Sequence, residues 1–372
     1  MSLIDTIHAQ LWQHSHDREG TELDQRILAL VDEHMPLATP EDRGKAVADV
    51  TARVAGLGPL QALANDPTVS EIMINAGSDV WVERAGTLER VDCPVDATHV
   101  EQLIRRLAAS GGRQIDRSSP SVDVRLADGS RLHAILPPLA IDGPALTIRR
   151  FSVRHLELAE LTTPVQLELL VDAVTKRATI VIAGATSSGK TTLLNALGAH
   201  VSDDERLVTV EDAAELRIPK PHIVRLEARL ESSTLPAISI RELVRHALRM
   251  RPDRIICGEM RGAEALDLIQ AMNTGHRGSL TTVHANSPAD ALRRIETMML
   301  LADADLPLGA VREQLAACID VIVMMGRTEG AGRSVMAVAE VPERGAGDTW
   351  TTTPLTDRNG VRNDPSRPWS TR

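Results

Sequence analysis

The stretch from Gly184 to Thr192 constrains the fold of this 372-residue chain more than any other. It opens with GATSSGKT, which matches the pattern GxxxxGK[ST] in full. The apolar run ATIVIA precedes the pattern, and the helix-forming run TTLLNALGAH follows it. This order predicts a buried strand, a glycine-rich turn and a helix whose N-terminus lies behind the turn.

Such a turn directs successive backbone N–H groups at an anion, so we expect it to bind a phosphate chain. The Lys190 ammonium can reach the β- and γ-phosphates of a nucleotide, and the Thr191 hydroxyl is a ligand for Mg²⁺. The expected cofactors are therefore ATP and Mg²⁺. A turn of this kind without a ligand is the alternative, and the strand, motif and helix together argue against it. The residues expected to contact the nucleotide are Gly184, Ala185, Thr186, Ser187, Ser188, Gly189, Lys190, Thr191 and Thr192.

The rest of the chain divides by its pattern into five segments. Residues 1–57 have the spacing of polar, amphipathic helices, and residues 58–151 read as strands and hairpins around one helix. Residues 152–163 form a connector. Residues 164–343 alternate short apolar strands with helices, which predicts a mostly parallel sheet covered on both faces. Residues 344–372 contain little apolar surface and are expected to form a mobile tail. The fold class is α/β, with a smaller α+β domain and a helical extension before the phosphate-loop domain.

Acidic and imidazole side chains follow three further strands of the expected sheet. The run LVTV ends in Glu211 and Asp212, RIICG ends in Glu259, and LTTV ends in His284. In an open parallel sheet, ligands bind outside the carboxyl ends of the strands. We therefore expect one cleft to gather these side chains around the phosphate loop.

Hydrolysis needs residues of these types. Glu259 and Glu211 are candidates to hold Mg²⁺, directly or through water, and to orient the attacking water. The sequence leaves open which carboxylate is the base, and for either alone a capping or solvated carboxylate is the alternative. His284 is a candidate sensor of the γ-phosphate, and the alternative is a histidine hydrogen-bonded at a strand end.

Composition argues against two other classes of protein. The net charge is −10, and the chain has one phenylalanine and no tyrosine, so we expect no stable binding of nucleic acid. No apolar run approaches the roughly 18 residues that span a bilayer. We therefore expect a cytoplasmic chain that reaches a membrane only through partners.

Four blocks of sequence resemble the CpaF-type secretion ATPases, the motors of tight-adherence (Flp) pili within the type II/type IV secretion ATPase superfamily. The blocks are EDAAEL (211–216), LRMRPDRIICGEMRG (248–262), QAMNTGH (270–276) and TTVHANSP (281–288). The resemblance extends through SEIMIN, GRQIDRSSPSVDVRLADGSRLHAILPP and TIRRF, and covers roughly residues 58 to 341. It implies a RecA-like C-terminal domain. It also implies that the family's "Asp box" falls on Glu211 and Asp212, its second nucleotide motif on Gly258-Glu259, and its "His box" on His284.

The resemblance further implies a homo-hexameric ring that docks on inner-membrane platform proteins at the cytoplasmic face. Nucleotide would lie between the two domains, and arginines of the N-terminal domain or a neighbouring subunit would approach the γ-phosphate. The candidates are Arg113, Arg131, Arg149 and Arg150. Arg149 and Arg150 are favoured because they end the N-terminal domain, and ordinary surface ion pairs are the alternative for each arginine.

The sequence departs from the family at a few positions and leaves two competing functions open. Ala185 and Ser187 stand where relatives often have glycine, at free positions of the motif, so we expect binding to survive. Arg277 stands where relatives are often acidic. The leading hypothesis is an ATPase that powers Flp/Tad-type pilus assembly or secretion. The alternatives are a DNA-handling conjugation motor and a nucleotide-gated scaffold, and Glu259 argues against the scaffold.

Overall fold

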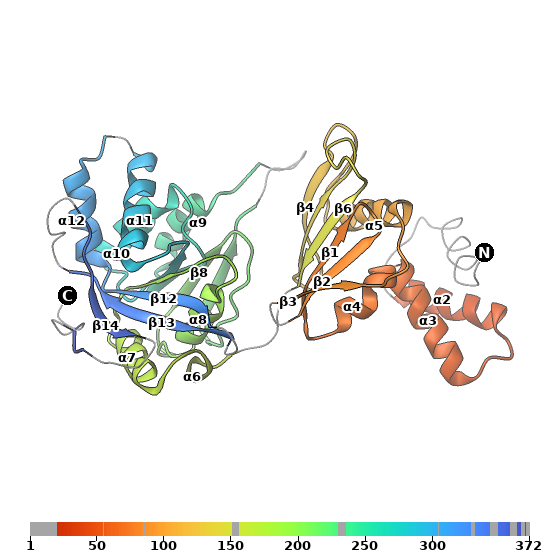
Figure 1. Ribbon diagram of the computed structural model, residues 1–372, viewed down its shortest axis with the longest axis horizontal. Helices are drawn as coiled ribbons and strands as arrows, with labels where there is room; N and C mark the ends of the chain where they lie inside the picture. The colour runs from red at the N-terminus through yellow and green to blue at the C-terminus, as the bar shows by residue number, and fades with distance from the viewer. Residues whose placement is uncertain are drawn as a thin grey trace. The chain divides into compact units, whose positions relative to one another are not determined.

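The computed structural model describes residues 21–54, 56–84, 87–150, 156–229, 236–303, 305–328, 332–342, 349–357, 363–365 and 369. The chain forms two compact units, residues 1–153 and 154–372 (Figure 1). Residues 1–20 of the expected helical extension and residues 152–155 of the expected connector lie outside the described residues.

The first unit begins with a pair of helices, α2 (Thr21–His34) and α3 (Pro40–Val54). They pack through Ile27, Val31 and Val50, which are fully buried. Thr39 precedes Pro40, and its hydroxyl accepts a hydrogen bond from the Asp42 backbone N–H at 3.1 Å. This is the usual arrangement of a capping side chain followed by proline at a helix start.

A six-stranded antiparallel sheet forms the rest of the described first unit, with α5 (Ala97–Ser110) packed on one face. The strand order is β3-β2-β1-β6-β5-β4. A short 3-10 helix, η1 (Gly58–Leu60), and α4 (Gln61–Asn65) lead into it. Alternate residues of the inner strands are buried, which explains their hairpin-like sequence pattern. The strands are β1 (Val69–Asn75), β2 (Asp79–Arg84), β3 (Thr87–Val91), β4 (Ser121–Arg125), β5 (Arg131–Ile135) and β6 (Ala145–Arg149).

The described second unit contains an eight-stranded sheet in the order β14-β13-β12-β7-β11-β10-β8-β9. The strands from β12 to β9 in this order run parallel, and β13 and β14 add to the β12 edge in antiparallel fashion. The predicted mostly parallel sheet is confirmed. The strands are β7 (Ile180–Ala183), β8 (Leu207–Glu211), β9 (Ile223–Glu227), β10 (Arg254–Cys257), β11 (Leu280–Val283), β12 (Val321–Thr328), β13 (Gly332–Glu340) and β14 (Thr353–Asp357).

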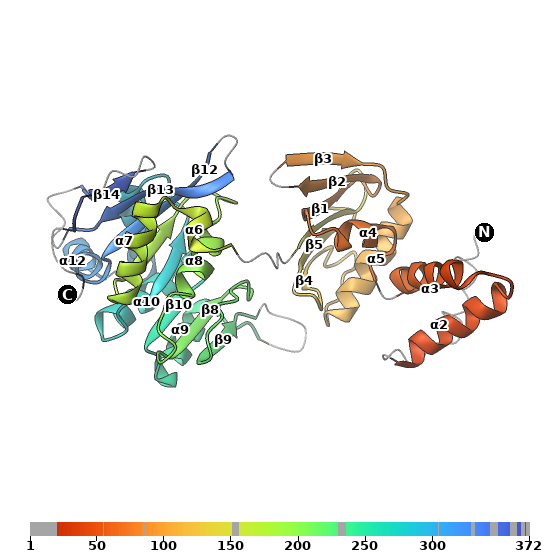
Figure 2. The same cartoon turned by 90° about the horizontal axis from the view of Figure 1, so that it is seen from below.

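Helices cover both faces of this sheet, as Figures 1 and 2 show. Ile180 and Ile182 of β7 join the core under α6 (Leu158–Leu161), α7 (Pro164–Thr175) and α8 (Lys190–Gly198). Val181 and Ala183 join the opposite core. That core lies under α9 (Ile240–Ala247), α10 (Glu264–Asn273), α11 (Pro288–Ala302) and α12 (Leu308–Cys318), and a 3-10 turn, η2 (Leu248–Met250), follows α9. Apolar side chains on both faces explain why the strands are continuous apolar runs.

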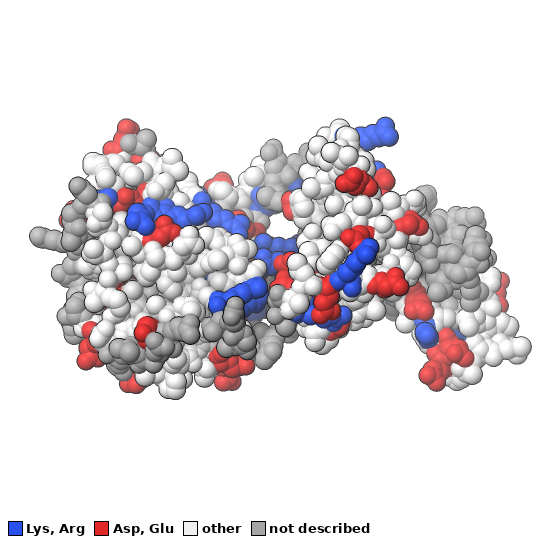
Figure 3. Space-filling view, in the orientation of Figure 1, with Lys and Arg blue, Asp and Glu red and all other residues white. Residues whose placement is uncertain are grey.

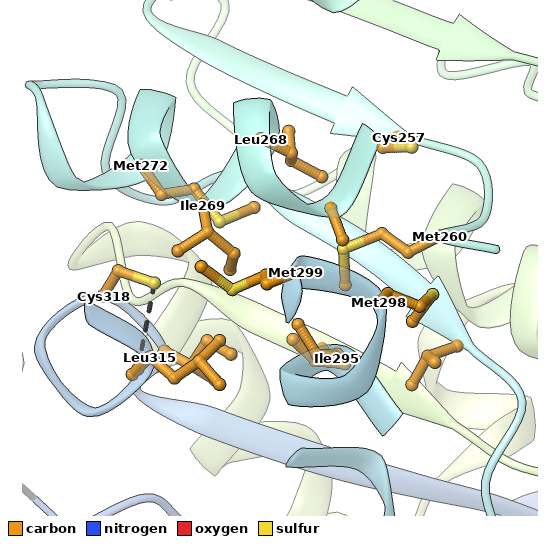
Figure 4. Packing of buried hydrophobic residues seen from close by; sticks show 14 of the residues in the cluster. Cys257, Met260, Leu268, Ile269, Met272, Ile295, Met298, Met299, Leu315 and Cys318 are labelled. Atoms are coloured by element: carbon orange, nitrogen blue, oxygen red, sulfur yellow. Dashed lines mark hydrogen bonds between the residues drawn. The ribbon is translucent and has the colours of Figure 1, made fainter. Parts of the chain in front are cut away.

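Methionine fills much of the core between α10, α11 and α12 (Figure 4). Met260, Met272 and Met299 are buried there beside Cys257 and Cys318. Burial raises the pKa of both thiols, so they pack as small apolar groups. In a chain with one phenylalanine and no tyrosine, flexible thioethers thus join the aliphatic side chains in packing this part of the core.

The described part of the C-terminal segment differs from the expected mobile tail. Thr353–Asp357 forms β14 and pairs with β13. Leu355 is fully buried, Trp350 is 5% exposed, and the Trp350 indole N–H donates to Glu296 Oε2 at 2.8 Å. The tail has too little apolar surface to fold alone, but its few large side chains are buried against a sheet that is already formed.

The structure explains why an arginine stands at position 277, at the amino-terminal edge of the sheet. Asp320 is fully buried just before β12, and its Oδ2 accepts a hydrogen bond from the Thr179 backbone N–H at 2.8 Å. An Arg277 Nη2 atom lies 3.7 Å from the same oxygen. The arginine therefore partly compensates a buried carboxylate that would otherwise be costly.

Candidate nucleotide-binding site

The phosphate loop joins β7 to α8 and has no room for a side chain at its first glycine. A Cβ atom on Gly184 would lie 2.5 Å from the Met325 carbonyl oxygen and 2.6 Å from Ser188 Oγ. Gly189 has φ +95° directly before the first turn of α8, and Ser187 has φ +57°. The loop thus exposes backbone at a helix N-terminus, the arrangement that a phosphate chain fits.

Lys190 is the first residue of α8 and is only 7% exposed. Its Nζ donates to the carbonyl oxygens of Gly184 at 3.1 Å and Ala185 at 2.9 Å. The same Nζ lies 3.2 Å from Nδ1 of His284, which follows β11. The ammonium is therefore held at the loop, next to the adjacent strand end.

A chain of polar contacts continues from His284 across the neighbouring strand ends. His284 Nε2 lies 2.7 Å from Oε1 of Glu259, which comes shortly after β10. The Arg261 guanidinium donates from Nε at 2.8 Å and from Nη2 at 2.5 Å to Oε2 of Glu259. Its Nη1 donates to Asp212 Oδ2, just after β8, at 2.9 Å. The ends of β7, β11, β10 and β8, which are consecutive in the sheet, are thus linked side chain to side chain.

The surroundings of His284 favour the neutral form of its imidazole ring. Burial lowers the pKa of His284 below its ordinary value. The neighbouring Glu259 carboxylate acts to raise this pKa, and the Lys190 and Arg261 cations lower it further. A neutral ring has one N–H donor and one acceptor, and an ammonium can only donate. Nδ1 therefore accepts from Lys190, while Nε2 lies within ion-pair distance of Glu259 Oε1, an oxygen that has no hydrogen-bond partner among the described residues.

Glu211 stands apart from this chain, although it ends β8 beside Asp212. It is 3% exposed, and its Oε1 accepts hydrogen bonds from the backbone N–H groups of Glu215 and Leu216, each at 2.9 Å. Its Oε2 is buried and has no hydrogen-bond partner among the described residues. Burial raises the pKa of Glu211 to about 7. The sequence left open which of Glu211 and Glu259 is the base, and the structure shows that their surroundings are different.

The candidate arginines of the first unit also differ from one another. Arg150 donates through Nη1 to the carbonyl oxygen of Asp66 and, at 2.8 Å, to that of Val69. Its guanidinium therefore makes hydrogen bonds within its own domain. Arg149 is half-exposed, and its Nε lies 3.8 Å from Glu71 Oε1. Arg131 lies directly opposite Arg149 on the neighbouring strand. Of the favoured pair, Arg149 presents its charge to solvent. Arg113, in the turn after α5, is half-buried.

Sequence reasoning missed Arg261, which bridges two of the carboxylates. The available signal was its place two residues after Glu259 in the block GEMRG. Within the described ranges, no group of three or more His, Cys, Asp or Glu side chains is arranged to hold a metal ion. Thr191 is the second residue of α8, so it lies at the helix N-terminus beside Lys190.

Comparison with known proteins identifies the family. The fold and the site define a RecA-like domain with a phosphate-loop motif between β7 and α8. A family model described as "Type II/IV secretion system protein" matches residues 53–329, so the chain belongs to that family of secretion ATPases. A Mycobacterium tuberculosis protein named for conjugal transfer is 39% identical over 299 residues, which cover 77% of this chain and 84% of that protein.

Further relatives agree with this family, and one solved structure agrees with the fold. The conjugal transfer protein TrbB of Rhizobium radiobacter is 36% identical over 74% of this chain and 85% of its own length. The type IV secretion system protein VirB11 of Bartonella quintana is 32% identical over 74% of this chain and 89% of its own length. The DotB ATPase of Legionella pneumophila has a TM-score of 0.57 at 22% identity, covering 76% of this chain and 79% of its own, which supports the fold alone. In the described residues, no helix combines the length and apolarity needed to cross a membrane.

Proposed function

We propose that this chain hydrolyses ATP and uses the energy to drive a secretion or pilus-assembly machine. The observation that carries the proposal is the polar chain from Lys190 through His284, Glu259 and Arg261 to Asp212, beside a phosphate loop. A scaffold that only binds nucleotide has no need of a carboxylate connected in this way to the phosphate-loop lysine.

The nucleotide's phosphates would be held by the backbone of residues 184–192, with the Lys190 ammonium at the β- and γ-phosphates. Mg²⁺ would be held by the Thr191 hydroxyl and the phosphate oxygens, with Glu259 acting through water. When bound, the metal neutralises negative charge on the transferred phosphoryl group.

We assign the orientation of the attacking water to Glu259 rather than Glu211. Glu259 lies between the His284 imidazole, 2.7 Å from its Oε1, and the Arg261 guanidinium, 2.5 Å from its Oε2, so it belongs to the polar chain that begins at Lys190. Glu211 is buried, and one of its oxygens already accepts two backbone hydrogen bonds. Its role in this account is to fix the loop from Asp212 to Leu216, and with it the Asp212 partner of Arg261.

The proposal also covers the oligomeric state of the protein, its location in the cell and the machine that it drives. The blocks that resemble CpaF-type ATPases favour a homo-hexamer at the cytoplasmic face, docked on inner-membrane platform proteins of a Flp/Tad-type pilus. Relatives named for conjugal transfer favour a second candidate, a conjugation motor. The net charge of −10 and the scarcity of aromatic residues argue against direct handling of DNA by this chain.

An allelic replacement separates the two candidates. Glu259→Gln is introduced into the chromosomal gene, and surface pilin, secreted protein and plasmid transfer are scored against wild type. The proposal predicts loss of surface pilin or secreted protein with plasmid transfer intact. Loss of plasmid transfer alone would support the conjugation motor instead.

A further inference from the structure

The β12–β13 hairpin flanks the phosphate loop on the side opposite His284. In the sheet, β7 lies between β12 and β11. The pairing of β12 with β7 reaches Met324 opposite Ala183, and β12 continues beyond it to Thr328. The carbonyl oxygen of Met325 packs so closely on Gly184 that no side chain fits between them. The hairpin therefore runs alongside the loop rather than ending before it.

Two arginines lie on the hairpin at the level of the loop. Arg327 and Arg333 are directly opposite each other in the β12–β13 register, and both side chains are exposed. Arg327 Nε donates to the Ser187 carbonyl oxygen at 3.4 Å. Arg333 Cδ would lie 3.2 Å from a Cβ atom on Gly189. Figure 3 shows basic side chains on the second unit near the end of this hairpin.

Two guanidinium groups are thus presented together beside the phosphate loop by the register of the hairpin. A solvated surface pair is the ordinary explanation for two arginines, but Arg327 donates to the backbone of the phosphate loop at Ser187, and the Arg333 side chain fills the space beside Gly189. Their position indicates a role toward what the loop binds.

The two sides of the loop face different ends of a nucleotide. Lys190, His284 and Glu259 define the γ-phosphate side, toward β11 and β10. The hairpin lies on the other side, so its arginines are placed for the α-phosphate and the nucleoside. A guanidinium both donates to phosphate oxygens and stacks on a planar base. Aromatic residues are scarce, with one phenylalanine, four tryptophans and no tyrosine, so arginine is an available substitute for an aromatic base clamp.

We propose that Arg327 and Arg333 form the binding site for the nucleoside end of the nucleotide, contacting the α-phosphate and the base from within the same subunit. The inference rests on the proposed nucleotide binding by residues 184–192, and it adds a site that the phosphate-loop motif does not contain.

Equilibrium binding tests this site without using turnover. The affinities of wild type and Arg327→Ala/Arg333→Ala for ADP and for a non-hydrolysable ATP analogue are measured by titration calorimetry, and pyrophosphate is measured by competition. The variant should lose about tenfold in affinity for both nucleotides alike, the scale of a charge-assisted hydrogen bond. Its affinity for pyrophosphate, which occupies only the loop, should stay within about twofold of wild type, the scale of a surface change.

A matched control is Lys176→Ala/Arg249→Ala, which removes two exposed positive charges from segments that precede β7 and β10, at the opposite edge of the sheet. This control should bind all three ligands as wild type does. Unchanged nucleotide affinity in the hairpin variant overturns the inference, as does a loss confined to the ATP analogue or a loss shared with pyrophosphate. A wild-type protein that binds neither nucleotide would instead overturn the proposed function itself.

Discussion

His284 lies between Lys190 and Glu259, with its Nε2 2.7 Å from Oε1 of Glu259. The opposite ring nitrogen lies 3.2 Å from Lys190 Nζ. The ring therefore contacts the phosphate-loop lysine through one nitrogen and the proposed water-orienting carboxylate through the other. The phosphate loop and the proposed water-orienting residue are therefore coupled through one side chain.

Acid pH should break the connection that His284 makes between the phosphate loop and Glu259. The pKa of His284 is lowered below its ordinary value of 6.5 by burial, so the ring is neutral at pH 7 and becomes protonated only as the pH falls below that value. Protonation removes the acceptor at Nδ1 and places a cation beside Lys190. We expect ATP turnover to fall on the acid side with an inflection below pH 6.5. In His284→Asn this inflection should be absent, and a profile identical in shape to wild type would exclude His284 as its origin.

Glu211 should make the stability of the ligand-free protein depend on pH. Its pKa is raised by burial from 4.5 to about 7, so the folded state keeps a proton that the unfolded chain releases. The stability from this proton is present below pH 4.5 and is lost as the pH rises to about 7. Urea unfolding should show wild type losing up to roughly 3 kcal/mol more than Glu211→Gln over this range. Parallel pH profiles for the two proteins would show that folding does not raise the pKa of Glu211.

Much of the second unit could be predicted from the sequence because its central strands are short apolar runs buried on both faces. The side chains at their ends could be grouped for the same reason. The bridge from Arg261 to Asp212 could not, since it depends on β10 lying next to β8 in the sheet, and chain order does not determine which strands are neighbours.

The edge of the sheet was harder to predict. β14 pairs with only one strand, and its sequence TPLTD has too few apolar residues for a period-2 signal. Its burial depends on the isolated Leu355 and on Trp350 nearby, whose partners are supplied by distant segments. The hairpin arginines were missed because only the register places Arg327 opposite Arg333.

A mixture of two inactive variants tests whether Arg149 acts on a neighbouring subunit. Lys190→Ala removes the ammonium group of the phosphate loop, and Arg149→Ala removes a guanidinium group that the first unit presents to solvent. Each variant alone should lose about a hundredfold or more in turnover. If the arginine acts in trans, mixed assemblies contain interfaces with one intact loop and one intact arginine, and turnover reappears. Arg150→Ala serves as a comparison, since its guanidinium is bonded within its own domain and its loss should act through stability. No recovery in any mixture would place Arg149 outside the neighbour's site.

The central claim is that Glu259 orients the attacking water beside a phosphate loop that binds ATP. The most direct measurement compares ATP binding and steady-state turnover in wild type and Glu259→Gln, with Lys190→Ala as the variant expected to lose both. The amide keeps the shape of the side chain and removes its charge. The account predicts ATP affinity within about twofold of wild type and turnover lower by about a hundredfold or more. Glu259→Gln that hydrolyses ATP at the wild-type rate would contradict it.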